Sequence, residues 1–97
     1  MRDQIHPGEH VQEEIEALGL TPEAFAEQLG VPVSRVQSLV DGKSNLDADM
    51  ALRLGHYFRM SPDFWLKLQN LYDLRCAEAR LGESLQQLPV AKHLQAA

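Results

Sequence analysis

Four neighbouring polar side chains could form direct hydrogen bonds with a polar ligand: Ser34, Arg35, Gln37 and Ser38. An arginine guanidinium donates two parallel hydrogen bonds to a planar pair of acceptors, and a glutamine amide can donate and accept together. These side-chain types distinguish base pairs from the edges exposed in the major groove of DNA. Because ordinary surface helices also carry such residues, the element that presents them decides what they can do.

A short amphipathic helix is predicted to carry these side chains and to close at Gly42. At about 100° per residue, its apolar residues share one face, and the four polar residues lie outside it. The apolar residues are Val33, Val36, Leu39 and Val40. The pattern therefore predicts a buried stripe behind a hydrogen-bonding outer surface.

Another short helix is predicted just before it, and a tight turn at Gly30 joins the two. Thr21 is a suitable N-cap, Pro22 suits the first helical position, and Leu20 and Phe25 occupy hydrophobic staple positions. Two short helices joined in this way are typical of a helix-turn-helix, whose second helix, here called the recognition helix, lies in the DNA major groove. An ordinary helical hairpin uses the same caps and stripe, so both interpretations remain open at this point.

The predicted first helix spans residues 7–18. Its apolar stripe consists of Val11, Ile15 and Leu18. His6 and His10 stand four residues apart, a spacing that can suit a metal ion on a regular helix. Because a Pro–Gly pair separates them at the helix start, the two imidazoles are not expected to share a helical face. A capping or packing role is the stronger interpretation, and no metal is expected.

A fourth helix is predicted to begin at the N-cap Asp47 and to extend through Phe58. Residues 41–46 form the loop between the recognition helix and this element, and loop donors in such a position commonly hold the DNA backbone beside the groove. Arg53 lies off the buried face of the fourth helix. It could contact a phosphate or pair with Asp49 at helical spacing.

The longest predicted helix begins at the N-cap Ser61 and ends at Gly82. One of its faces is formed by Trp65, Leu68, Tyr72, Cys76 and Ala79. Because apolar residues cover so much of its circumference, this helix is expected either in the core or shared with a second copy of the chain. Pro89 interrupts the weaker pattern that follows, which predicts a short helix and a tail. We expect a domain over residues 1–82 and a C-terminal extension over residues 83–97.

Charge is distributed unevenly over the 97 residues, whose formal net charge is −5. Residues 1–30 contain seven acids and one base, residues 31–60 three acids and four bases, and the remainder four of each. The least acidic third holds the recognition helix, which is compatible with DNA binding. The acidic net charge nevertheless predicts weak non-specific DNA affinity and a need for dimerisation. Cys76 is the single cysteine, which excludes an internal disulfide. No apolar run approaches the ~18 residues of a membrane span or forms a signal peptide, so a cytoplasmic protein is expected.

Four segments occur in a characteristic order: HPGE at residues 6–9, the two-helix unit at 21–43, LDADMALRLGHYF at 46–58 and SPDFWLKLQNLYDL at 61–74. Together they resemble the HigA-type antitoxins, a branch of the XRE (lambda-repressor-like) helix-turn-helix proteins. The resemblance covers about residues 6–75. It implies an all-α domain of five helices that acts as a homodimer and binds a palindromic operator of its own operon. It also implies binding and silencing of a HigB-type toxin, a RelE-like mRNA endonuclease.

Carried over by position, the resemblance implies base contacts by Ser34, Arg35 and Ser38, with Gln37 at the edge. It implies phosphate contacts by Thr21, Lys43 and Asn45. Val33 is apolar where a polar residue is usual, so it could contact a thymine methyl group or simply pack. Asp41 stands where asparagine commonly precedes the Gly–Lys pair, and it puts a carboxylate near the phosphates. The resemblance assigns no role to the chain from Cys76 onward.

Three functions remain open from the sequence. The first is an antitoxin that represses its own operon, and the second is a stand-alone XRE-family transcriptional regulator without a toxin. The third is a helical protein-interaction module without DNA affinity, which the net charge and the single base in the recognition helix would favour. An enzyme is not expected, because no Ser/His/Asp or Cys/His set and no Gly-rich phosphate loop can be assigned. No cofactor is expected either.

Overall fold

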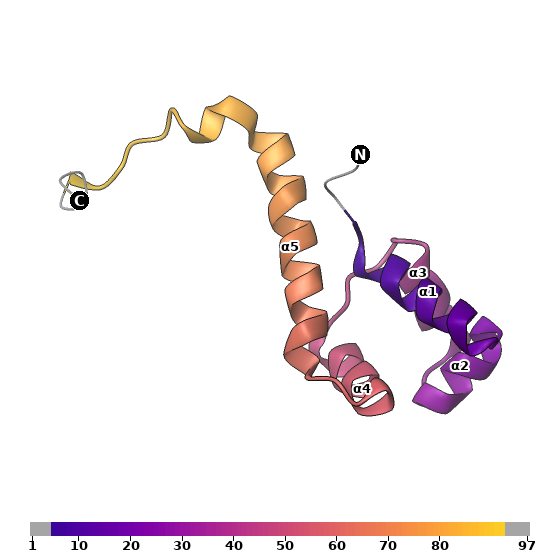
Figure 1. Cartoon of the computed structure of the whole chain (residues 1–97). Helices are drawn as coiled ribbons and strands as arrows, with labels where there is room; N and C mark the ends of the chain where they lie inside the picture. Colours follow the sequence, from indigo (N-terminus) through magenta and orange to yellow (C-terminus); the bar gives the residue numbers. More distant parts are fainter. Residues whose placement is uncertain (1–4, 93–97) are drawn as a thin grey trace.

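The computed structural model describes residues 5–92, which form five α-helices and no strand. In chain order these are α1 (Pro7–Leu18), α2 (Pro22–Leu29), α3 (Val33–Val40), α4 (Ala48–Phe58) and α5 (Pro62–Leu81), followed by the 3-10 turn η1 (Gly82–Leu85). The predicted all-α architecture of five helices is confirmed. Helices α1–α4 gather into one body, and the second half of α5 projects away from it (Figure 1). No helix of the described residues is long and apolar enough to cross a membrane.

Local contacts determine where α2 begins and where it ends, at the turn that leads into α3. The Thr21 hydroxyl accepts a hydrogen bond from the Ala24 N–H at 3.1 Å, as its predicted N-cap role requires. Gly30 ends α2 with a φ of 74°, a left-handed conformation in which a Cβ would be strained. The chain therefore reverses sharply between α2 and α3, as a helix-turn-helix requires.

His6 supplies the N-cap of α1. Its Nδ1 accepts a hydrogen bond from the Gly8 N–H at 2.9 Å, and the Glu9 carboxylate accepts one from the His6 N–H at 3.3 Å. This reciprocal pair is a capping box with an imidazole in the place of the usual hydroxyl. Of the capping and packing roles predicted for His6, the structure shows the capping role. Among the described residues, no cluster of three His, Cys, Asp or Glu side chains could hold a metal ion.

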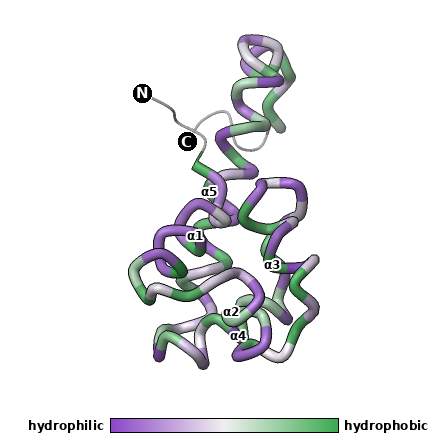
Figure 2. Tube along the Cα trace, turned by 90° about the vertical axis from the view of Figure 1, so that its right-hand side faces the viewer, coloured by the Kyte–Doolittle hydropathy of each residue, from purple (hydrophilic) through white to green (hydrophobic). Residues whose placement is uncertain are grey.

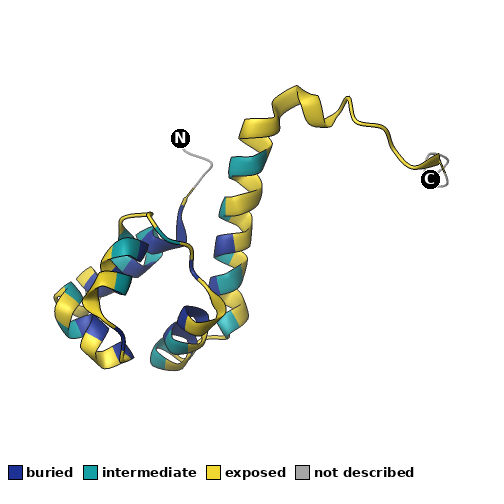
Figure 3. Cartoon of the chain, turned by 180° about the vertical axis from the view of Figure 1, so that it is seen from behind, coloured by how far each residue is buried: buried dark blue, intermediate teal, exposed yellow. Residues whose placement is uncertain are grey.

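One apolar core lies between α1–α4 and the first half of α5. Its largest fully buried side chains are Trp65, Phe25, Ile15, Leu54, Val11 and Val36. Burial ends midway along α5, whose projecting half and η1 are mostly exposed (Figure 3). Hydrophobic residues nevertheless continue into that exposed end (Figure 2). Leu18 departs from the prediction: it is 47% exposed, whereas Ile15 in the same last turn of α1 is buried.

Gly8 lets the start of α1 touch the backbone of α3, the recognition helix. A Cβ at this position would lie 1.9 Å from the carbonyl oxygen of Leu39. No side chain fits at that distance, so glycine is required for close approach rather than for a turn. The HPGE segment therefore both caps α1 and sets the position of α3.

Candidate nucleic-acid interface

Helix α3 turns its polar residues outward and its apolar stripe inward. Val36 and Leu39 are 0% and 2% exposed, so they anchor the helix in the core. Val33 departs from the predicted buried stripe: it is 40% exposed at the first turn, which leaves its methyl groups available for an apolar contact. The accessible or partly accessible polar residues of α3 are Ser34, Arg35, Gln37 and Ser38.

An open groove of about 240 Å³ lies between α3, the following loop and the start of α4. Its polar lining is formed by Ser34, Arg35, Ser38, Ser44, Asn45 and Asp47, above the apolar Leu39 and Met50. The groove thus brings three of the four candidate base contacts together with Asn45, a candidate phosphate contact. Gln37 lies outside it and donates instead to the Asp41 carboxylate at 3.2 Å.

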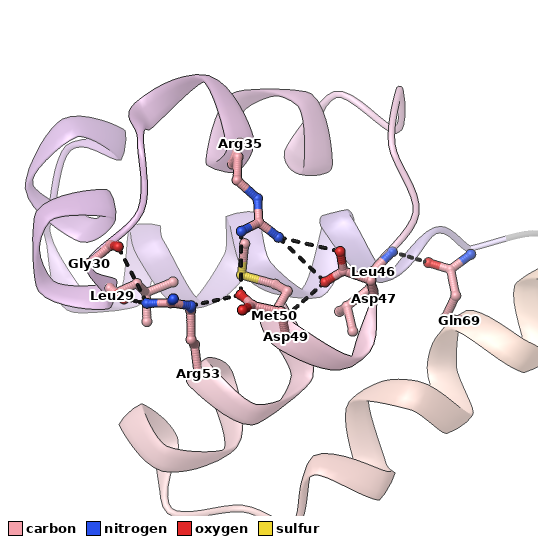
Figure 4. Close-up of polar contacts among 9 residues, drawn as sticks. All are labelled: Leu29, Gly30, Arg35, Leu46, Asp47, Asp49, Met50, Arg53 and Gln69. Atoms are coloured by element: carbon pink, nitrogen blue, oxygen red, sulfur yellow. Dashed lines mark hydrogen bonds and ion pairs between the residues drawn. The ribbon is translucent and has the colours of Figure 1, made fainter.

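Arg35 is held by two carboxylates at the start of α4. Its Nη1 lies 3.3 Å from Asp49 Oδ1, and its Nη2 lies 3.4 Å from Asp47 Oδ1 (Figure 4). The guanidinium therefore spans the groove wall between α3 and α4. Sequence reasoning missed this contact, although two aspartates in the first turn of the helix after the recognition helix were a usable signal.

Arg53 ties α4 to the turn between α2 and α3. Its Nε donates to Asp49 Oδ1 at 2.7 Å, and its Nη1 donates to the carbonyl oxygens of Leu29 and Gly30 at 2.8 and 3.3 Å (Figure 4). Of the two roles left open by the sequence, the structure therefore shows the pairing with Asp49. The hydrogen bond from Arg53, with a smaller contribution from Arg35, holds the pKa of Asp49 below its ordinary value of 3.8.

This network should weaken in acid. Because the pKa of Asp49 is lower in the folded chain than in the unfolded chain, its stabilising contribution is present above pH ~4 and is lost as the pH falls through the folded value. We expect the difference in the free energy of unfolding between wild type and Asp49→Asn to shrink between pH ~5 and ~2. Urea denaturation at several pH values measures it, and a difference that does not change with pH would contradict the assignment.

One candidate phosphate contact caps α2, and the other two lie in the loop after α3. Thr21 is exposed, and because its oxygen accepts the capping bond, its hydroxyl hydrogen can donate to an anion. Lys43 is exposed in the loop after α3, where its N–H donates to the Ser38 carbonyl oxygen at 2.8 Å. Asn45 follows in the same loop and is anchored by Gln69 of α5 through a 3.3 Å hydrogen bond.

The three α5 residues assigned to the core or to a dimer contact lie against the body. Trp65 is 2% exposed, and Leu68 packs partly buried against the same core. Tyr72 meets the His6 ring edge-on, with 4.8 Å between ring centroids. A different set of apolar residues along α5 stays exposed: Phe64, Leu71, Leu74 and Leu81.

Comparisons with known proteins agree with this geometry. A helix-turn-helix family model matches residues 11–65. The chain is 43% identical to virulence-associated protein I of Dichelobacter nodosus over 75 residues, which cover 76% of this chain and 69% of the relative. A HigA-family addiction module antidote protein from Coxiella burnetii has a solved structure with a TM-score of 0.88 and 36% identity, covering 94% of this chain and 99% of that one. Antitoxin HigA of Pseudomonas aeruginosa, solved with the higBA promoter, gives a TM-score of 0.85 at 36% identity, over 92% and 98% of the two chains.

Proposed function

The chain belongs to the XRE-type helix-turn-helix family, in the branch of the HigA antitoxins, and from this premise we propose that it is an antitoxin that represses its own operon. In this role it binds operator DNA as a homodimer in the cytoplasm and neutralises a HigB-type, RelE-like mRNA endonuclease. The observation that carries the DNA-binding part is the outer face of α3. A helix anchored by Val36 and Leu39 presents hydrogen-bonding side chains around an open groove. The P. aeruginosa HigA solved with promoter DNA supports the same use of this fold.

On DNA, we assign direct base contacts to Ser34, Arg35, Gln37 and Ser38. We assign phosphate contacts to Thr21, Lys43 and Asn45. Base contacts specify the sequence, whereas phosphate contacts set the register of the protein on the duplex. Val33 extends the base-reading surface with methyl groups that suit the thymine methyl. The carboxylates of Asp47 and Asp49 keep non-specific attraction to phosphate low, in line with the net charge of −5.

The exposed stripe on α5 supports dimerisation. Phe64, Leu71, Leu74 and Leu81 fall within an arc of about 100° on a helical wheel, so they share one face. These large apolar side chains are 39–61% exposed along a helix that projects from the body, and pairing with a second copy would bury them. In the dimer, the two α3 helices should lie about 34–36 Å apart, which matches half-sites one helical turn apart.

Arg35→Ala should weaken operator binding by roughly 1–3 kcal/mol and relax specificity at one base pair, because a bidentate guanine contact is lost. Fluorescence anisotropy with the operator and with scrambled duplexes of equal length measures both effects. Arg35→Lys is the matched control, since it keeps the charge but loses the planar fork. Equal weakening on every sequence would instead make Arg35 a phosphate contact.

Co-expression with the product of the adjacent gene tests the antitoxin role directly. We expect this chain to co-purify with a small basic protein and to retain its own promoter DNA in the same preparation. Promoter binding without a protein partner would make the chain a stand-alone regulator. A protein partner without any promoter binding would make it an interaction module.

A further inference from the structure

Gln69 is a buried polar residue on α5 that faces the loop after the recognition helix. Gln69 is only 5% exposed, and its side chain joins α5 to that loop. Its Oε1 accepts a hydrogen bond from the Leu46 N–H at 2.7 Å (Figure 4). Its Nε2 donates to Asn45 Oδ1 at 3.3 Å and to Asp73 Oδ1 at 2.9 Å.

The chemistry of its partners determines which way the Gln69 amide points. The Leu46 N–H can only donate, so the atom that faces it must be the carbonyl oxygen of Gln69. The Asp73 carboxylate can only accept, so the atom that faces it must be the NH2 group. Both partners therefore select the same orientation, and the reversed amide would lose both hydrogen bonds.

This orientation in turn determines the orientation of Asn45. Because the Gln69 NH2 group donates towards Asn45, the oxygen of the Asn45 amide must face inward. The NH2 group of Asn45 is then directed to the other side, and Asn45 lines the groove beside α3 together with Ser34 and Ser38. Phosphate oxygens accept hydrogen bonds and do not donate, so only this orientation of Asn45 suits a DNA backbone.

We propose that Gln69 is a positioning residue, which fixes the Asn45 amide with its NH2 group towards a phosphate of the bound DNA. This inference rests on the proposed function, because the Asn45–phosphate contact belongs to it. Gln69 itself touches no DNA. It acts from α5, 24 residues beyond Asn45 in the chain, and holds the loop by the side chain of one residue and the backbone of the next.

A charge-neutral exchange tests the proposal: Gln69→Glu combined with Asp73→Asn. A carboxylate at position 69 still accepts from the Leu46 N–H, and an amide at position 73 can donate to it. The contacts of position 69 with Leu46 and with position 73 therefore both persist. The carboxylate cannot donate to Asn45, however. The Asn45 amide should turn over to donate inward, which presents its oxygen to the phosphate. We expect operator affinity to fall roughly tenfold, since a hydrogen bond to a charged group is lost and replaced by repulsion.

The same exchange in an Asn45→Ala background separates positioning from a structural effect. If Gln69 acts through Asn45, the exchange should change operator affinity less than about twofold when position 45 is alanine. An equal loss in both backgrounds would overturn the proposal, because Gln69 would then act through the fold. If the exchange leaves operator affinity unchanged while position 45 is still asparagine, that result would overturn the proposal as well.

A measurement without DNA keeps this inference distinct from the proposed function. In the exchanged variant, a side-chain amide proton of Asn45 should move downfield in the NMR spectrum, since it gains a carboxylate acceptor. A shift with no promoter binding by the wild-type chain would refute the proposed function and leave the orientation of Asn45 supported. An unshifted Asn45 amide would overturn the positioning role, whatever the DNA affinity.

Discussion

Replacing Trp65 with alanine should lower the free energy of unfolding by roughly 3–5 kcal/mol. The indole is 2% exposed and packs between aromatic rings, with centroid distances of 5.8 Å to Phe58 and 5.3 Å to Phe64. Its removal would leave a cavity where α4 and α5 meet, and the main contact between α5 and the body would loosen. Urea denaturation followed by circular dichroism measures the loss.

Two variants serve as controls for Trp65→Ala. Trp65→Phe keeps an aromatic ring in the same place and should cost much less than the alanine variant. Leu52→Ala removes an apolar side chain from the neighbouring helix α4, but one that is 62% exposed and outside the stripe assigned to the dimer. It should change the free energy of unfolding by no more than ~0.5 kcal/mol. Near-wild-type stability of Trp65→Ala, together with a loss of dimer or toxin binding, would place Trp65 in an interface instead of the core.

Gly8→Ala should destabilise the fold by roughly 1–3 kcal/mol although alanine is the better helix former. The added methyl group would lie 1.9 Å from the Leu39 carbonyl oxygen and 2.7 Å from its carbon, and neither atom is the end of a flexible side chain. Helix α3 would have to move away from α1. We therefore expect a second effect, a weaker affinity for operator DNA, because the polar face of α3 and the groove beside it would shift together.

Ala17→Gly is the matched control for Gly8→Ala. Ala17 is exposed in the same helix, so this change reports helix propensity alone and should cost at most ~1 kcal/mol. If Gly8→Ala instead raises the stability by a similar amount, the close approach of α1 and α3 is not a constraint. Denaturation of the three proteins under one set of conditions decides between the two outcomes.

The sequence by itself determined the helices and their ends. His6, Thr21 and Asp47 accept hydrogen bonds from backbone N–H groups two or three residues away, and Gly30 closes a turn within its own helix end. Such contacts depend only on near neighbours in the chain, so residue type and spacing suffice to predict them. The apolar periodicity of α3 is equally local. It already separated the buried Val36 and Leu39 from the polar residues that could contact DNA bases.

Only the tertiary structure decided what surrounds these candidate DNA-contacting residues. Arg35 pairs with carboxylates 12 and 14 residues further along the chain, Arg53 reaches a turn 23 and 24 residues back, and Gln69 holds the loop at Asn45 and Leu46. These contacts depend on the angles at which α3, α4 and α5 pack. Those angles follow from the filling of one core by many side chains at once, and not from any local pattern. The recognition helix was therefore readable in the sequence, whereas the constraints on its arginine and its loop appear only when the helices are packed together.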